Sequence, residues 1–117
     1  HLVLRRQRQM CIRDRHNLYL KIKERKQASP NASYSAMLFD RGTGHICQKV
    51  GEEAVETVIS ALRGTKRELV EESADLIYHL LVLWADAEIE PDSVWDELRR
   101  REDQSGLDEK LQRGDNN

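Results

Sequence analysis

The stretch KVGEEAVETVISAL, residues 49–62, decides the fold of this 117-residue chain. Its apolar side chains recur at the spacing of an α-helix, which predicts a helix over residues 46–62. On a helical wheel, one broad half of this helix is apolar and should be its core face: Val50, Ala54, Val55, Val58, Ile59 and Leu62. Three glutamates, Glu52, Glu53 and Glu56, cluster on the other side and border that face.

A second long helix is predicted directly after the first, over residues 66–87, with Gly64 as the C-terminal cap between them. Glu72 and Asp75 are three residues apart and share one face of this helix, which gives it an acidic pair of its own. If the two helices pack antiparallel around the Gly64 turn, the acidic pairs of both helices can face one another.

Four carboxylates that face one another repel, unless a cation neutralises them. A hard divalent cation takes oxygen ligands, so these residues predict a Mg²⁺ site, with Mn²⁺ as a second choice and zinc disfavoured. An acidic face that is only solvated is the alternative. His79, four residues after Asp75, fits a hydrogen-bonded packing residue better than a metal ligand.

Shorter helices are predicted on both sides of this pair. One begins near Asn17; Ser33 can cap another over residues 34–40; and Pro91 opens a last one over residues 92–101. The sequence shows no strand pattern. We therefore predict an all-α fold, a helical bundle of about four to five helices completed by oligomerisation.

The need for a partner comes from LIYHLLVLW, residues 76–84, which is apolar nearly all round. Such a helix must be covered on most sides, which is more than the shorter helices of one chain can do. We expect a homodimer or a higher homo-oligomer.

Composition excludes several other classes of partner. The net charge of −2 offers no basic field for nucleic acid, and no apolar run approaches the length of about 20 residues that a membrane span needs. The two cysteines match no zinc or redox spacing. We expect a cytoplasmic protein that binds neither nucleic acid nor membrane.

The chain divides into three parts. Residues 1–15 form a basic segment whose string RRQRQMCIRDR looks like translated sequencing-adaptor read-through, so we expect this segment not to be native. Residues 16–104 carry the helical pattern and should form the functional domain. Residues 105–117 are polar and are expected to be a loose tail.

The paired motifs E-E-x-x-E and E-x-x-D resemble those of the all-α nucleoside-triphosphate pyrophosphohydrolases, the MazG-like superfamily. Within it, the chain resembles the phosphoribosyl-ATP pyrophosphohydrolases of histidine biosynthesis, through SYSAMLF at 33–39, QKVGEEAVE at 48–56 and ESADLIYHLLVLW at 72–84. This resemblance implies a helical bundle, at least dimeric, that uses Mg²⁺ to hydrolyse phosphoribosyl-ATP to phosphoribosyl-AMP and pyrophosphate.

The resemblance also implies roles for particular residues. The metal ligands would be Glu53, Glu56, Glu72 and Asp75. Glu52 would sit beside them, and either Glu52 or Glu53 would orient the attacking water as a base. Lys49 would contact phosphate, or would simply pair with Glu53 one turn away. Ser33 and Tyr34 would line the nucleotide pocket.

Two other functions stay open on the sequence. One is a house-cleaning pyrophosphohydrolase for non-standard nucleotides, which would share the metal site. The other is a non-enzymatic helical interaction module with an acidic face. A thermal shift that depends on magnesium would separate an enzyme from such a module.

Overall fold

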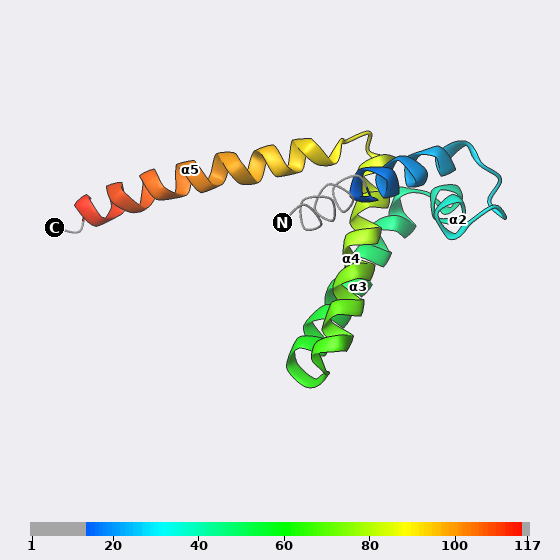
Figure 1. Ribbon diagram of the computed structural model, residues 1–117, viewed down its shortest axis with the longest axis horizontal. Coiled ribbons are helices and arrows are strands. Elements are labelled where there is room, and N and C mark those ends of the chain that lie inside the picture. The colour runs from blue at the N-terminus through cyan, green and yellow to red at the C-terminus, as the bar shows by residue number, and fades with distance from the viewer. Residues whose placement is uncertain (1–13, 116–117) are drawn as a thin grey trace, which may run out of the picture.

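The computed structural model describes residues 14–115, and every element in this range is helical (Figure 1). An N-terminal helix, described over residues 14–24, leads into the short 3₁₀ turn η1 (Arg25–Gln27). Four α-helices follow: α2 (Tyr34–Arg41), α3 (Thr43–Arg63), α4 (Lys66–Asp86) and α5 (Pro91–Asp115). The predicted all-α class is confirmed.

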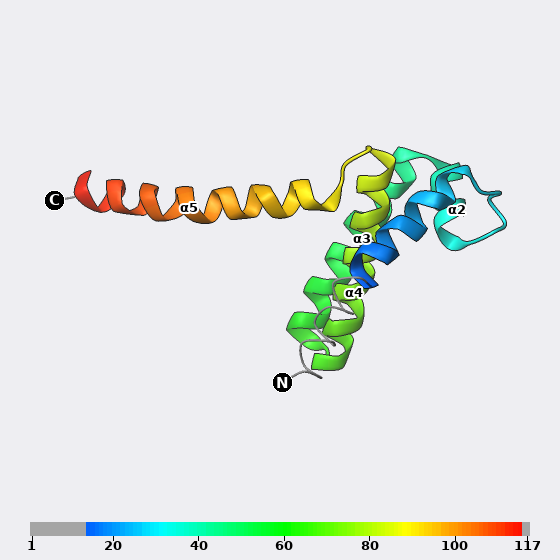
Figure 2. The same cartoon turned by 45° about the horizontal axis from the view of Figure 1, so that its top comes forward.

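Helices α3 and α4 form an antiparallel hairpin around Gly64, as predicted, and two views of the chain show them side by side (Figures 1 and 2). The Gly64 amide donates to the Ser60 carbonyl over 2.9 Å and closes α3. The Thr65 hydroxyl then accepts the Glu68 amide over 3.1 Å and caps α4, which satisfies one of the free amides of its first turn.

The apolar core lies at the open end of this hairpin, where the N-terminal helix and α2 pack against α3 and α4. Its buried members are Tyr19, Ile22, Leu38, Ile46, Leu81, Val82 and Ala85. The Tyr19 hydroxyl donates to the Ile89 carbonyl over 2.8 Å, so the N-terminal helix also holds the corner where α4 turns into α5. This end of the molecule fixes the start of α2 against α4.

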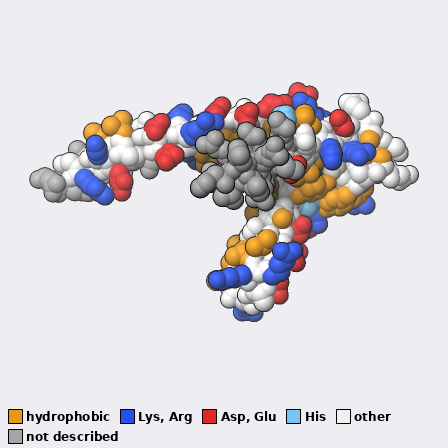
Figure 3. Space-filling model, viewed as in Figure 1, with side chains coloured by type: hydrophobic (Ala, Val, Ile, Leu, Met, Phe, Trp, Pro, Cys, Tyr) orange, Lys and Arg blue, Asp and Glu red, His pale blue; other side chains and the backbone are white. Residues whose placement is uncertain are grey.

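The expected core face of α3 is wrong for the single chain. Val58, Ile59 and Leu62 are exposed by 57%, 54% and 78%, whereas Glu53 is 7% exposed. Glu53, Thr57 and Ser60 follow one another at helical spacing along the seam with α4, and the apolar stripe faces away from it. A two-helix hairpin buries only a narrow seam, so the broad apolar face remains on the surface (Figure 3).

Helix α5 differs from the expected short helix and loose tail, since it continues to Asp115 and projects away from the hairpin (Figure 1). Trp95 at its start packs edge-to-face on Trp84 of α4, with ring centroids 6.1 Å apart. Ion pairs one turn apart, such as Arg100–Glu97 and Arg113–Glu109, line its surface. Such pairs support a solvated helix of polar composition. The polar composition of residues 105–117 suggested a loose tail, whereas the helix continues to Asp115.

The expectation that residues 1–15 are not native falls almost wholly outside the described residues, which begin at residue 14. Among the described helices, none combines the length and the apolar character needed to cross a membrane.

Candidate metal and nucleotide site

The α3–α4 hairpin brings three acidic side chains together near its middle. Glu53 and Glu56 of α3 and Glu72 of α4 each offer a carboxylate oxygen, and these oxygens lie within 4.8 Å of one another. The antiparallel packing expected from the sequence thus places three of the four predicted ligands at one point.

Thr57 ties the two helices together at this level. Its hydroxyl donates to the Glu53 carbonyl over 2.7 Å and lies 3.2 Å from the Glu72 carbonyl oxygen. The contact fixes the register of α3 against α4 where the acidic side chains meet. Sequence reasoning missed Thr57, although its position four residues after Glu53 placed it on the same face.

Two carboxyl groups of this cluster, those of Glu53 and Glu72, have raised pKa values. Burial raises the pKa of Glu53, and the charge of Glu56 raises it further. A hydrogen bond with Glu56, together with desolvation and the neighbouring charges, raises the pKa of Glu72 to about 7. The Glu72 carboxyl group therefore keeps its proton at a pH where an isolated glutamate is ionised.

Two oxygens of this cluster, Glu53 Oε2 and Glu72 Oε2, are shielded from solvent and have no hydrogen-bond partner among residues 14–115. A buried acceptor without a donor is costly, and three close carboxylates repel. A divalent cation would satisfy both oxygens and neutralise the repulsion. Because the donors are all carboxylate oxygens, they fit Mg²⁺ or Mn²⁺ better than zinc.

Asp75, the fourth predicted ligand, lies at the edge of this cluster. It follows Glu72 by three residues on α4 and is exposed. Its charge helps to raise the pKa of both Glu53 and Glu72, so it faces the same region. It is not one of the three residues whose oxygens meet.

Lys49 and Glu52 flank the cluster on α3. The Lys49 ammonium lies 3.1 Å from Glu52 Oε2 and 3.9 Å from Glu53 Oε1. Glu52 is exposed, and hydrogen bonds from Gln48 and Lys49 lower its pKa. Lys49 therefore pairs with both Glu52 and Glu53 at the side of the acidic cluster.

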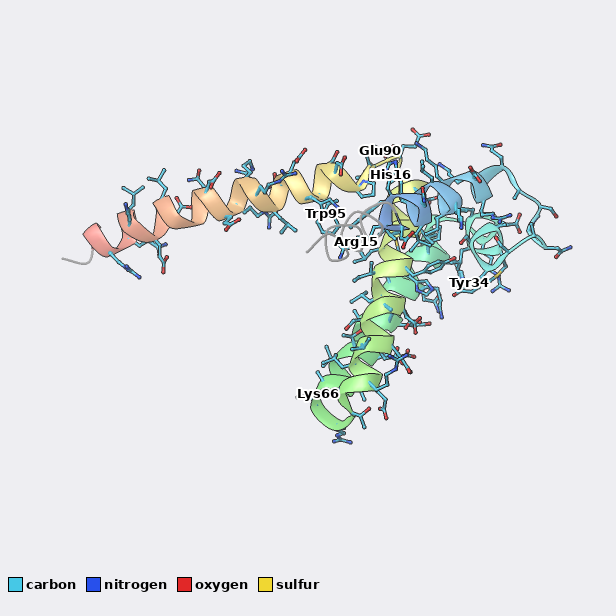
Figure 4. All side chains as sticks on the ribbon, viewed as in Figure 1. Arg15, His16, Tyr34, Lys66, Glu90 and Trp95 are labelled. Atoms are coloured by element: carbon cyan, nitrogen blue, oxygen red, sulfur yellow. The ribbon has the colours of Figure 1, made fainter. Side chains whose placement is uncertain are left out.

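Ser33 and Tyr34 stand where α2 begins. The Ser33 hydroxyl accepts the Ala36 amide over 3.1 Å and caps α2, so it has a local structural role. The Tyr34 hydroxyl lies 2.9 Å from Nε2 of His79 on α4. Burial raises the pKa of Tyr34, the charge of Lys49 lowers it, and the charges of Glu53 and Asp75 raise it. Figure 4 shows Tyr34 at α2, beside the α3–α4 hairpin.

Comparisons with known proteins agree on one family. The sequence pattern of the phosphoribosyl-ATP pyrophosphohydrolase family matches residues 15–102. The chain is 60% identical to the phosphoribosyl-ATP pyrophosphatase of Azospirillum brasilense over 93 residues, which cover 80% of this chain and 84% of that protein. It is also 60% identical over 96 residues to the enzyme of the same name from Paramagnetospirillum magneticum, covering 82% and 88% of the two chains.

Proposed function

Since the chain belongs to the phosphoribosyl-ATP pyrophosphohydrolase family, we propose that it hydrolyses phosphoribosyl-ATP to phosphoribosyl-AMP and pyrophosphate in histidine biosynthesis. The observation that carries this proposal is 60% identity to an enzyme of that name over most of both chains. The meeting of Glu53, Glu56 and Glu72 in the hairpin supports it, because hydrolysis within a triphosphate needs concentrated charge neutralisation.

Mg²⁺, or Mn²⁺ in its place, would be held by Glu53, Glu56 and Glu72, with Asp75 as the fourth ligand at the edge. When bound, such an ion neutralises phosphate oxygens and lowers the pKa of a coordinated water. The fit rests on the all-oxygen donor set and on two buried carboxylate oxygens that have no partner within the residues that the structure describes.

The residues around the cluster would activate the attacking water and bind the phosphates and the nucleotide. Glu52 or Glu53 would orient the attacking water and take its proton as the water oxygen bonds to phosphorus. The anhydride bond between the α- and β-phosphates breaks, and pyrophosphate leaves. Lys49 would contact the phosphates as a point charge, while Ser33 and Tyr34 would line the nucleotide pocket.

The proposal includes an assembly and a location. A homodimer or a higher homo-oligomer would cover the exposed apolar stripe of α3, which one chain leaves in solvent. Residues 16–104 would form the catalytic domain. A cytoplasmic location fits an enzyme whose substrate is a charged nucleotide retained inside the cell.

Pyrophosphate release from phosphoribosyl-ATP, compared with a panel of nucleoside triphosphates and measured with and without Mg²⁺, tests the proposal. We expect release only with metal, and fastest from phosphoribosyl-ATP. Faster release from a non-standard triphosphate would favour a house-cleaning enzyme. Absence of both turnover and a magnesium-dependent thermal shift would favour an interaction module.

A further inference from the structure

His79 is buried on α4, 4% exposed, and both of its ring nitrogens have partners. Nδ1 lies 2.7 Å from the Asp75 carbonyl oxygen, and a carbonyl can only accept, so Nδ1 carries the hydrogen. In the neutral ring Nε2 is then an acceptor. The Tyr34 hydroxyl, 2.9 Å away, must therefore be the donor to His79.

The Tyr34 ring is held on two further sides. It stacks on Tyr78, with ring centroids 6.1 Å apart and planes inclined by 26°, and it meets His79 edge to face. Tyr78 is itself held by a hydrogen bond between its hydroxyl and that of Ser35. One hydrogen bond and two aromatic contacts thus fix a side chain that is nevertheless 44% exposed.

This fixed ring stands beside the acidic site. Its partner His79 is hydrogen-bonded over 2.7 Å to the backbone carbonyl of Asp75, the proposed fourth ligand. Burial raises the pKa of the Tyr34 hydroxyl, the charge of Lys49 lowers it, and the charges of Glu53 and Asp75 raise it. An aromatic face is a stacking surface for a nucleobase. In the proposed substrate, the base is joined through one ribose to the triphosphate, so a base platform is needed close to the phosphate site.

We propose that His79 is a positioning residue, which fixes the Tyr34 ring as a stacking platform for the purine base of the nucleotide. This inference rests on the proposed function and assigns to His79 a role in base recognition. His79 acts through Tyr34 and needs no contact with the phosphates or with the metal.

Two variants remove the same hydrogen bond from opposite ends. Tyr34→Phe keeps the ring but loses the donor, and His79→Phe keeps an aromatic edge but loses the acceptor. Each should raise KM for phosphoribosyl-ATP by about three- to tenfold, the effect of losing one hydrogen bond, with kcat nearly unchanged. The double variant should be no worse than His79→Phe, which already lacks the shared contact and also loses the bond from Nδ1 to the Asp75 carbonyl.

A third variant, Tyr34→Leu, removes the platform itself. In the presence of Mg²⁺ it should weaken ATP binding by on the order of tenfold, as expected for the loss of base stacking. Inorganic tripolyphosphate, which carries the phosphates without the base, should bind all variants as tightly as the wild type. His16→Phe, a histidine replacement on the exposed part of the N-terminal helix, is the matched control and should bind ATP normally.

Equal weakening of tripolyphosphate and ATP binding would overturn the inference, as would a fall in kcat with unchanged KM. If His79→Phe fails to fold, as judged by circular dichroism, Tyr34→Phe tests the same bond from the exposed side. If the wild type does not hydrolyse phosphoribosyl-ATP, the proposed function fails. The contrast between ATP and tripolyphosphate binding then still tests the platform by itself.

Discussion

Glu53 and Glu72 each bury a carboxylate oxygen that meets no hydrogen-bond donor in the described part of the chain, which raises the free energy of the metal-free site. Hydrophobic side chains would pack at this seam without such a penalty. Carboxylates there are costly unless something binds them, which is why buried groups with displaced pKa values point to function rather than to stability.

The ligand assignment predicts the behaviour of single variants. Glu53→Gln and Glu72→Gln should abolish turnover that depends on Mg²⁺, because each removes a charged ligand from the cluster. Without metal, their unfolding temperature should hold or rise slightly, since repulsion is relieved. Asp75→Asn should also lose turnover if Asp75 completes the site.

The matched control for these variants is Glu71→Gln, next to Glu72 but exposed and paired with Arg67. It should keep wild-type turnover and metal affinity. Both are measured by pyrophosphate release and magnesium titration. Full activity in Glu53→Gln would remove Glu53 from the ligand set.

The raised pKa of Glu72 predicts how the metal-free protein responds to pH. Its folded-state pKa of about 7 exceeds the ordinary glutamate pKa of 4.5, so the folded state binds the proton more tightly. The contribution to stability is complete below the unfolded pKa and is lost as pH rises through the folded pKa. Without metal, the free energy of unfolding should therefore fall between pH 5 and 8.

Chemical denaturation in the presence of a chelator at several pH values measures this fall. Glu72→Gln, which does not titrate at this position, should show a smaller fall over the same range. Mg²⁺ should restore stability at pH 8, because it binds the ionised cluster. An equal slope in wild type and variant would show that Glu72 does not carry the effect.

The turn of the α3–α4 hairpin depends on one glycine, Gly64. A Cβ on Gly64 would lie 2.9 Å from the Ser60 carbonyl oxygen and 3.1 Å from its Cα, and backbone atoms cannot move aside cheaply. Gly64→Ala should therefore cost about 1–3 kcal/mol in the free energy of unfolding, as other overpacked substitutions do.

Gly51, in the middle of α3, is the control for Gly64. A Cβ there meets nothing within 4 Å, so Gly51→Ala should stabilise the helix by roughly 0.5–1 kcal/mol in the same denaturation assay. A loss of stability in both variants would mean that Gly51 also lies in a crowded place, such as a subunit interface.

The two acidic helices and the turn between them could be predicted from sequence because periodicity, cap and charge spacing agreed locally. The sequence did not predict which face of α3 packs against α4. Apolar periodicity shows that one face of a helix will be covered, but it does not show which element or which subunit covers it. Residues such as Val58 and Ile59 point away from α4, and Thr57 occupies the seam. The length of α5 was missed because ion pairs along a helix leave no apolar period.

The molecule is more extended than a compact single domain of the same length. Its radius of gyration is 18.2 Å, whereas a compact domain of this size has about 13 Å. The difference comes from the hairpin and α5, which project from the core in different directions (Figures 1 and 2). Extended helices with exposed apolar side chains are typical of chains that fold together with a partner.

The apolar stripe on α3 predicts self-association. Light scattering at micromolar concentration should give a mass at least twice the 13.6 kDa of one chain. Ile59→Asp places a charge in the stripe and should shift the protein toward 13.6 kDa. The control Arg67→Asp changes an exposed ion-pair residue of α4 and should leave the mass unchanged. A wild-type protein of monomer mass would contradict the proposed assembly.

Because Trp84 of α4 and Trp95 of α5 are in contact, the corner between these two helices can be followed by optical spectroscopy. The chain has two tryptophans, and both lie at this corner with their rings perpendicular and in contact. Tryptophan emission and the ultraviolet dichroism of the coupled indoles therefore report on how α5 is set against α4. A change in these signals on assembly or on nucleotide binding would record movement of α5, without any label attached to the protein.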